Sequence, residues 1–127
     1  MGVGLAACGG SRQQGSFGIA VLGIGHLSLG QAIPAIDASR VCRLAGLVSS
    51  SREKLEDTGR RYGVPASAWY GYDDFDAIEA DEGIDAIYIA VPNALHHEYT
   101  TRALRAGKHV LCEKPLAMNS KEAEKMV

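Results

Sequence analysis

The chain alternates between short apolar runs and longer segments with helical periodicity. Five runs rich in apolar residues predict strands, over 17–23, 41–48, 68–72, 84–91 and 109–112. The first and the fourth run are apolar almost throughout instead of alternating with polar residues. Such runs are typical of strands that are buried on both faces of a parallel sheet.

The segments between these runs predict helices. They cover 27–38, 50–62, 73–80 and 93–106, and a last helix opens at Asn119 and is still running at Val127. Ser50 and Glu53 have the spacing of a capping box, and Gly63 is placed to end the same helix. Asn93 is placed to cap the fourth helix. Pro34 predicts a bend or a late start in the first one.

Strands that alternate with helices through short loops indicate an α/β fold, a doubly wound parallel sheet with helices on both faces. We expect one domain over 16–127. Residues 1–15 are small, Gly-rich and without periodicity, which predicts a flexible tail or the remnant of an export leader.

Composition excludes several classes of function. The 127 residues carry a formal net charge of -2, which gives no reason to expect a nucleic acid as partner. No apolar stretch is long enough to span a bilayer. The cysteines Cys8, Cys42 and Cys112 are widely spaced and form no C-x-x-C pair, so we expect neither a disulfide framework nor a metal site. We expect Cys42 and Cys112 to be small buried side chains of strands.

A glycine-rich turn follows the first predicted strand. Gly23 and Gly25 enclose one residue, and Ser28 occupies the third position of the G-x-G-x-x-G pattern after His26 and Leu27. In that pattern the first glycine permits a tight turn and the second lets a pyrophosphate approach the backbone at a helix N-terminus. Glycine pairs also end strands for structural reasons. The position within a βαβ unit nevertheless favours dinucleotide binding.

The second predicted strand ends without the acidic residue that usually binds the ribose hydroxyls of NAD. Ser49 and Ser50 stand there, Arg52 and Lys54 follow, and the first acid is Glu53. Hydroxyls with two cations suit a 2′-phosphate better than a bare diol, which favours NADP over NAD. Helix capping and a solvated helix face are the structural alternative, and both can hold together.

Two further loops follow predicted strands at the edge where open α/β sheets bind ligands. They are Pro92-Asn93-Ala-Leu-His96 and Glu113-Lys114-Pro115. A single His is more often structural, and a single Lys is more often a solvated surface residue. Their shared place at the cofactor edge makes both loops candidate sites.

The glycine turn and these two loops resemble the Gfo/Idh/MocA oxidoreductase family, and within it the glucose–fructose oxidoreductase branch. The resemblance covers about Phe17 to Val127. It implies a Rossmann NAD(P)-binding fold and hydride transfer between a nicotinamide cofactor and a sugar, a polyol or a related carbohydrate. P-N-x-x-H and E-K-P at this separation are highly specific, whereas the glycine turn alone is not.

The resemblance also implies roles for single residues. Lys114 matches the lysine that reaches the nicotinamide and the substrate hydroxyl, and is the expected catalytic residue. A cation there can stabilise alkoxide character as hydride leaves. The other matches are to cofactor-binding positions. Glu113 and Pro115 shape the lysine loop, Asn93 and His96 line the nicotinamide side, Ser49, Ser50 and Lys54 belong to the 2′-phosphate region, and Tyr72 lies near the cofactor.

The chain departs from the family pattern in two ways. Ser28 replaces the usual Gly or Ala, which is a small change. The family's sixth strand and C-terminal α+β domain, which supply substrate-binding residues, are missing, so the fold is expected to be truncated. We therefore expect nucleotide binding with little turnover here, and a carbohydrate substrate and a homo-oligomer for the intact protein.

The N-terminal residues Leu5-Ala-Ala-Cys8 have the form of a bacterial lipoprotein processing site, at which Cys8 would be lipidated. A working signal needs a basic segment and a longer apolar segment before it. The alternatives are a periplasmic or lipid-tethered protein, if the leader is completed upstream, and a cytoplasmic one with a chance match.

Two other functions compete with the oxidoreductase hypothesis. A non-catalytic dinucleotide-binding or redox-sensing module would use the same fold, but would have no evident need for Lys114. A methyltransferase-like protein would bind a different nucleotide, and the loops at 92–96 and 113–115 argue against it.

Overall fold

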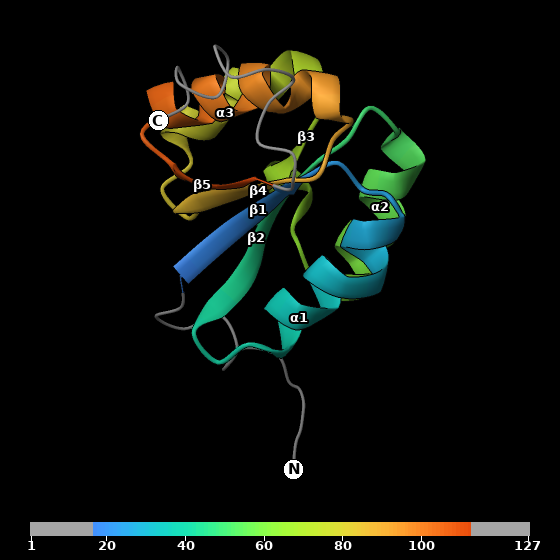
Figure 1. Cartoon of the computed structure of the whole chain (residues 1–127). Helices are drawn as coiled ribbons and strands as arrows, with labels where there is room; N and C mark the ends of the chain where they lie inside the picture. The colour runs from blue at the N-terminus through green and yellow to red at the C-terminus, as the bar shows by residue number, and fades with distance from the viewer. Residues whose placement is uncertain (1–16, 113–127) are drawn as a thin grey trace.

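A sheet of parallel strands forms the centre of the chain (Figure 1). The structure is a computed structural model, and it describes residues 17–112. Within them the strands are β1 (Phe17–Leu22), β2 (Cys42–Val48), β3 (Trp69–Tyr70), β4 (Ala86–Ile89) and β5 (His109–Cys112). Their order in the sheet is β3-β2-β1-β4-β5, and every neighbouring pair is parallel. This order is that of a Rossmann fold and confirms the expected doubly wound sheet.

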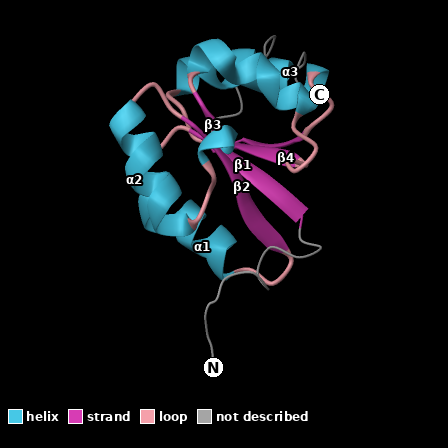
Figure 2. Ribbon diagram, turned by 180° about the vertical axis from the view of Figure 1, so that it is seen from behind, coloured by secondary structure: helices cyan, strands magenta, loops and turns pink. Residues whose placement is uncertain are grey.

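Helices cover both faces of the sheet (Figure 2). One face carries α1 (Ile33–Ala38) and α2 (Arg52–Tyr62). The opposite face carries α3 (His96–Arg105) and the 3-10 helix η4 (Tyr72–Ala80). Right-handed crossovers that run outward from β1 in two directions place helices on opposite faces, which explains the two layers.

Strand β1 lies in the middle of the sheet and is buried on both faces. Ile19, Ala20, Val21 and Leu22 are each at most 4% exposed. Successive side chains of a strand point to opposite faces, so the run packs against both helix layers. The continuous apolar run therefore has the burial predicted for it.

The helix after β1 is not uniform. Helical residues begin at His26, the stretch Ser28–Ala32 is π-helical, and α1 follows from Ile33. The amide of Ile33 bonds to the carbonyl oxygen of Ser28, five residues back. Pro34 lies in the first turn of α1, directly after the π-helical stretch. The predicted irregularity at Pro34 is thus a change of helix type just before the proline.

The N-terminal cap of α2 is one residue later than the sequence predicts. Ser51 is the cap residue, and its hydroxyl accepts a hydrogen bond from the amide of Lys54. The capping box expected at Ser50 is wrong, because the side chain of Ser50 is exposed and the helix opens at Arg52. Gly63 ends α2 with a left-handed φ of 74°, as predicted.

Two further helix predictions need correction. The segment expected as an ordinary helix over 73–80 is the 3-10 helix η4, Tyr72–Ala80. Asn93 does not cap α3; it opens the short 3-10 turn η5 (Asn93–Leu95), and Leu95 takes the cap position. The amide of Leu95 bonds to the carbonyl oxygen of Pro92 at 2.8 Å, so a tight turn separates β4 from the helix.

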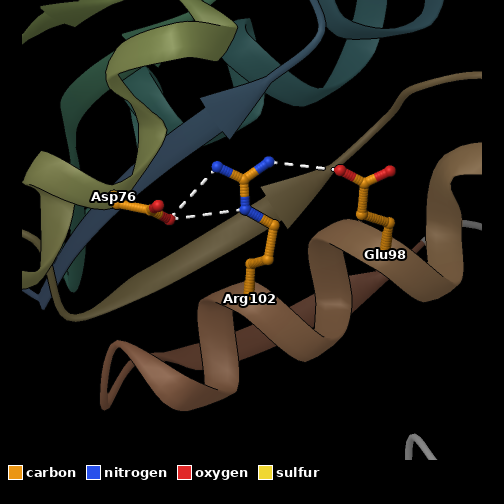
Figure 3. A network of polar contacts seen from close by, with 3 residues as sticks. All are labelled: Asp76, Glu98 and Arg102. Atoms are coloured by element: carbon orange, nitrogen blue, oxygen red, sulfur yellow. Dashed lines mark hydrogen bonds and ion pairs between the residues drawn. The ribbon is translucent and has the colours of Figure 1, made fainter.

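Arg102 joins α3 to η4 (Figure 3). Its guanidinium makes ion pairs with Asp76 of η4 at 3.1 Å and with Glu98 of α3 at 3.2 Å. The same group lies 5.1 Å from the ring centre of Phe75 and 5.0 Å from that of Tyr99. One side chain therefore holds together the layer opposite α1 and α2.

Part of the sheet face beside α1 is open among the described residues. A groove of about 410 Å³ lies there, and Leu111 of β5 is 50% exposed in it. Its lining is mainly apolar: Ile19, Leu27, Gln31, Ala32, Ala35, Ile36, Tyr88 and Leu111. Within residues 17–112 no helix is long and apolar enough to cross a membrane. Cys42 is half-buried at the start of β2, less buried than expected.

Candidate dinucleotide site

The carboxyl ends of the parallel strands meet at one edge of the sheet, and backbone hydrogen bonds tie them together. The amide of Gly23 bonds to the carbonyl oxygen of Val48 at 2.9 Å, and the amide of Ser49 to that of Tyr70 at 3.0 Å. On the other side of β1, the amide of Ala90 bonds to the carbonyl oxygen of Leu22 at 2.8 Å. The loops that the sequence singles out after β1, β2, β3 and β4 therefore start from one connected edge.

The two glycines of the turn after β1 are glycine for different structural reasons. Gly23 has a φ of 97°, and a Cβ there would lie 2.5 Å from the carbonyl oxygen of Ala90. Only glycine fits, because both the backbone conformation and the space exclude a side chain. Among residues 17–112, a Cβ at Gly25 would meet nothing within 4 Å. Gly25 therefore borders open space directly before the helix that begins at His26, where a pyrophosphate could reach the backbone.

Ser28 acts on this turn through its hydroxyl group. The hydroxyl donates to the carbonyl oxygen of Gly23 at 2.6 Å, and the residue is 1% exposed. Such a buried side chain offers no surface to a ligand. His26 and Leu27, also predicted at the turn, are exposed. Ser28 thus positions the turn, whereas Leu27 also lines the apolar groove beside α1.

The loop after β2 is organised by two of its three serines. Ser49 is 6% exposed, and its side chain accepts a hydrogen bond from the amide of Ser51 at 3.0 Å. Ser51 in turn caps α2. Ser50 is exposed between them. Ser51 is absent from the site residues predicted from the sequence. A serine three residues before Lys54 has the spacing of a helix cap, but the adjacent serines offer similar spacings, so the sequence does not single it out.

Two cations follow this loop at the start of α2, as predicted. Lys54 is exposed. Arg52 bonds through Nε to Glu56 at 3.2 Å, and its guanidinium carbon lies 5.5 Å from the ring centre of Trp69. The first amides of a helix have no partner within the helix, and they give this end a partial positive charge. The start of α2 therefore combines cations and hydroxyl groups, which suits a phosphate.

Tyr72 lies just beyond β3 and is half-buried. Its ring centre is 5.5 Å from that of Tyr99 on α3. Burial first, and then the nearby Tyr99, raises the pKa of the Tyr72 phenol. The phenol therefore stays neutral to a higher pH than an ordinary tyrosine side chain.

His96 belongs to the loop after β4, but its ring is not at the surface. It is 1% exposed, and Nε2 lies 2.9 Å from the carbonyl oxygen of Val91. An imidazole N–H that donates to this carbonyl fixes the turn through Pro92 and Asn93, which makes His96 a positioning residue. Pro92 is exposed beside it. The side chain of Asn93, all of Glu113, Lys114 and Pro115, and Cys8 lie outside what the structure describes.

The donor set at this edge suits an organic dinucleotide. The open space at Gly25, the helix that starts at His26 and the hydroxyl-rich loop after β2 lie along adjacent strands β1 and β2. Within residues 17–112 no group of three or more His, Cys, Asp or Glu side chains could hold a metal ion. A crevice at the ends of such strands is where doubly wound sheets bind nucleotides.

Comparison with known proteins agrees with this geometry. Residues 17–127 match the model of an oxidoreductase family with an NAD-binding Rossmann fold, Gfo/Idh/MocA. A D-xylose 1-dehydrogenase [NADP(+)] from Haloarcula marismortui is 40% identical over 108 residues, which are 85% of this chain and 30% of that protein.

Two solved structures are similar in fold and sequence. An aldose-aldose oxidoreductase from Caulobacter crescentus, complexed with glycerol, has a TM-score of 0.85 and 41% identity over 87% of this chain and 33% of its own. A 3-ketoreductase from Actinomadura kijaniata in complex with NADP has a TM-score of 0.78 and 32% identity over 87% of this chain and 34% of its own. This chain thus spans about a third of the length of the relatives it matches.

Proposed function

This chain belongs to the Gfo/Idh/MocA oxidoreductase family, with an NAD-binding Rossmann fold, and we propose that it binds NADP along the carboxyl edge of its sheet. We further propose that it is the cofactor-binding part of an oxidoreductase that acts on a sugar or a polyol. The observation that carries the proposal is the pair of glycines after β1. Gly23 makes the turn, and Gly25 leaves the space at the helix start into which a pyrophosphate fits.

The preference for NADP rests on the loop after β2. Among Ser49–Lys54 the one acid is Glu53, on the first turn of α2, and Arg52 and Lys54 flank it. A carboxylate at the end of β2 would bind the ribose hydroxyls of NAD and repel a 2′-phosphate, whereas hydroxyls and cations attract it. The xylose dehydrogenase and the 3-ketoreductase are NADP proteins by name, which supports the same choice.

The substrate class rests on the relatives. Two of them are named for action on xylose and on aldoses. When bound, the nicotinamide cofactor supplies the acceptor or donor of hydride. The chain's part is to hold the cofactor with its nicotinamide toward the loop after β4. The buried ring of His96 fixes this loop through its contact with the carbonyl oxygen of Val91. We assign Lys114 the catalytic role at the substrate oxygen by its resemblance to the E-K-P lysine.

The experiment is a titration of the 127-residue chain with NADPH and with NADH, after circular dichroism has shown that it is folded. A charge-assisted contact contributes about 1.5–3 kcal/mol, so NADPH is expected to bind about ten- to a hundredfold more tightly. Arg52→Gln and Lys54→Gln should lower this ratio. Arg60→Gln, at the far end of α2, is the matched control and should leave it unchanged.

Two results would contradict the proposal. Equal binding of NADPH and NADH would overturn the choice of NADP while leaving the dinucleotide site in place. No binding of either cofactor by the folded chain would overturn the site itself.

A further inference from the structure

Trp69 is the single tryptophan of the chain, and its ring packs against α2 and the loop that follows it. Its indole Nε1 donates to the carbonyl oxygen of Val64 at 2.8 Å. Gly59 of α2 leaves the space for the ring, because a Cβ there would collide with the indole. The ring is therefore a fixed platform beside the helix.

The guanidinium of Arg52 lies against this platform and away from the start of α2. Its ion-pair partner Glu56 is one turn further along the helix, with Nε and Oε2 3.2 Å apart. Trp69, at 5.5 Å from the guanidinium carbon, lies in the same direction, beside Gly59. The Arg52 side chain is nevertheless 70% exposed, so it can rotate without disturbing the core.

We propose that Glu56 and Trp69 hold Arg52 in a stored position, and that these two residues thereby set how strongly the chain prefers NADP over NAD. The inference rests on the proposed function, in which the 2′-phosphate binds at the loop Ser49–Lys54. To reach that phosphate, the guanidinium must leave both the carboxylate and the ring. The free energy needed to break these two contacts reduces the binding free energy that Arg52 gains from the 2′-phosphate. A cofactor without this phosphate leaves Arg52 in its place, so its affinity carries no such cost.

The first test uses adenosine 2′,5′-bisphosphate and 5′-AMP as probes, titrated into the full 127-residue chain by calorimetry. Glu56→Gln removes the competing carboxylate, and an exposed ion pair corresponds to roughly a two- to fivefold change in affinity. The bisphosphate is therefore expected to bind about two- to fivefold more tightly to Glu56→Gln, with 5′-AMP unchanged.

Asp57→Asn is the matched control, because Asp57 is the next residue of α2, is exposed and has no ion pair within residues 17–112. It removes the same charge without touching Arg52, so it should change neither affinity. An equal gain in bisphosphate affinity in both variants would mean that the loss of any negative charge on α2 strengthens binding, and would overturn the inference. No gain in Glu56→Gln would overturn it as well.

The second test uses the fluorescence of Trp69, which reports on its own neighbour because the chain has no other tryptophan. Saturation with the bisphosphate should change the wavelength or the intensity of the Trp69 emission, because Arg52 leaves the ring. Saturation with 5′-AMP should leave the emission unchanged. The response should be lost in Arg52→Gln. An unchanged emission at saturating bisphosphate would show that Arg52 stays on Trp69 and would overturn the stored position.

The two proposals fail in different ways. If the wild-type chain binds the bisphosphate and 5′-AMP equally, the 2′-phosphate site is absent and the inference falls with it. If the bisphosphate binds more tightly while Glu56→Gln and the Trp69 emission show no effect, the proposed function stands and the inference alone is wrong.

Discussion

The hydroxyl group of Ser28 donates a hydrogen bond to the carbonyl oxygen of Gly23 across five residues, at 2.6 Å and out of contact with solvent. The bond links the first residue of the glycine turn to the helix that the turn opens. It gives the residue at the third position of the glycine pattern a role beyond small size.

Ser28→Ala should therefore destabilise the chain. It leaves the Gly23 carbonyl without its donor, and a buried polar group left unpaired costs about 1–3 kcal/mol. The free energy of unfolding in urea measures this. Ser50→Ala, at an exposed serine, is the control and should change it by less than about 0.5 kcal/mol. A similar free energy of unfolding for the two variants would mean that the Ser28 hydrogen bond does not stabilise the fold.

The two glycines should respond differently to alanine. Gly23→Ala combines a φ of 97° with a collision at Ala90, and should cost about 2–5 kcal/mol of folding free energy. The new methyl group of Gly25→Ala meets no atom of residues 17–112 within 4 Å, so this variant should fold at least as stably. Its methyl group enters the proposed pyrophosphate space, so NADPH affinity should fall at least about tenfold. Unchanged NADPH affinity in Gly25→Ala would place the cofactor elsewhere.

Arg102 should contribute to stability through several partners at once. Arg102→Met removes two ion pairs and the contacts with two aromatic rings, which together correspond to about 1–2 kcal/mol. Thermal unfolding measures the loss. Arg105→Met, at an exposed arginine of the same helix, is the control and should be close to neutral. Added salt should shrink the effect of Arg102→Met in part, because Asp76 is 81% exposed.

Stability should fall at alkaline pH because of Tyr70. Burial first, and then the hydrogen bond to Asp81 at 2.7 Å and its negative charge, raises the pKa of the Tyr70 phenol far above its usual value. The folded state thus keeps a proton that the unfolded state loses near pH 10. The contribution is fully present below about pH 10 and is lost as the pH rises further.

Urea unfolding at pH values from about 8 to about 11 checks this dependence. Tyr70→Phe lowers stability at neutral pH, since the Asp81 bond is gone, but its stability should decline less steeply above pH 10. An identical decline in both proteins would assign the alkaline sensitivity to other groups.

The sequence by itself determined the strand pattern and the place of the glycine turn. The apolar run that begins at Phe17 predicted a strand buried on both faces, and its continuous apolar character is a local property. Gly63 was predicted as a helix end, because a left-handed residue after a helix is a local requirement that glycine meets best. The edge that carries the candidate site followed from the parallel order of the strands.

Tertiary structure decided what depends on partners distant in the sequence. Three adjacent serines offer equivalent caps, and the bond from the amide of Ser49 to Tyr70 of β3 places the start of α2 so that Ser51 caps it. Trp69 meets Arg52, and Arg102 meets Asp76, only because β3 lies beside α2 and η4 packs on α3. Local patterns specify helices and strands, whereas side-chain pairs across elements exist only after the elements have packed.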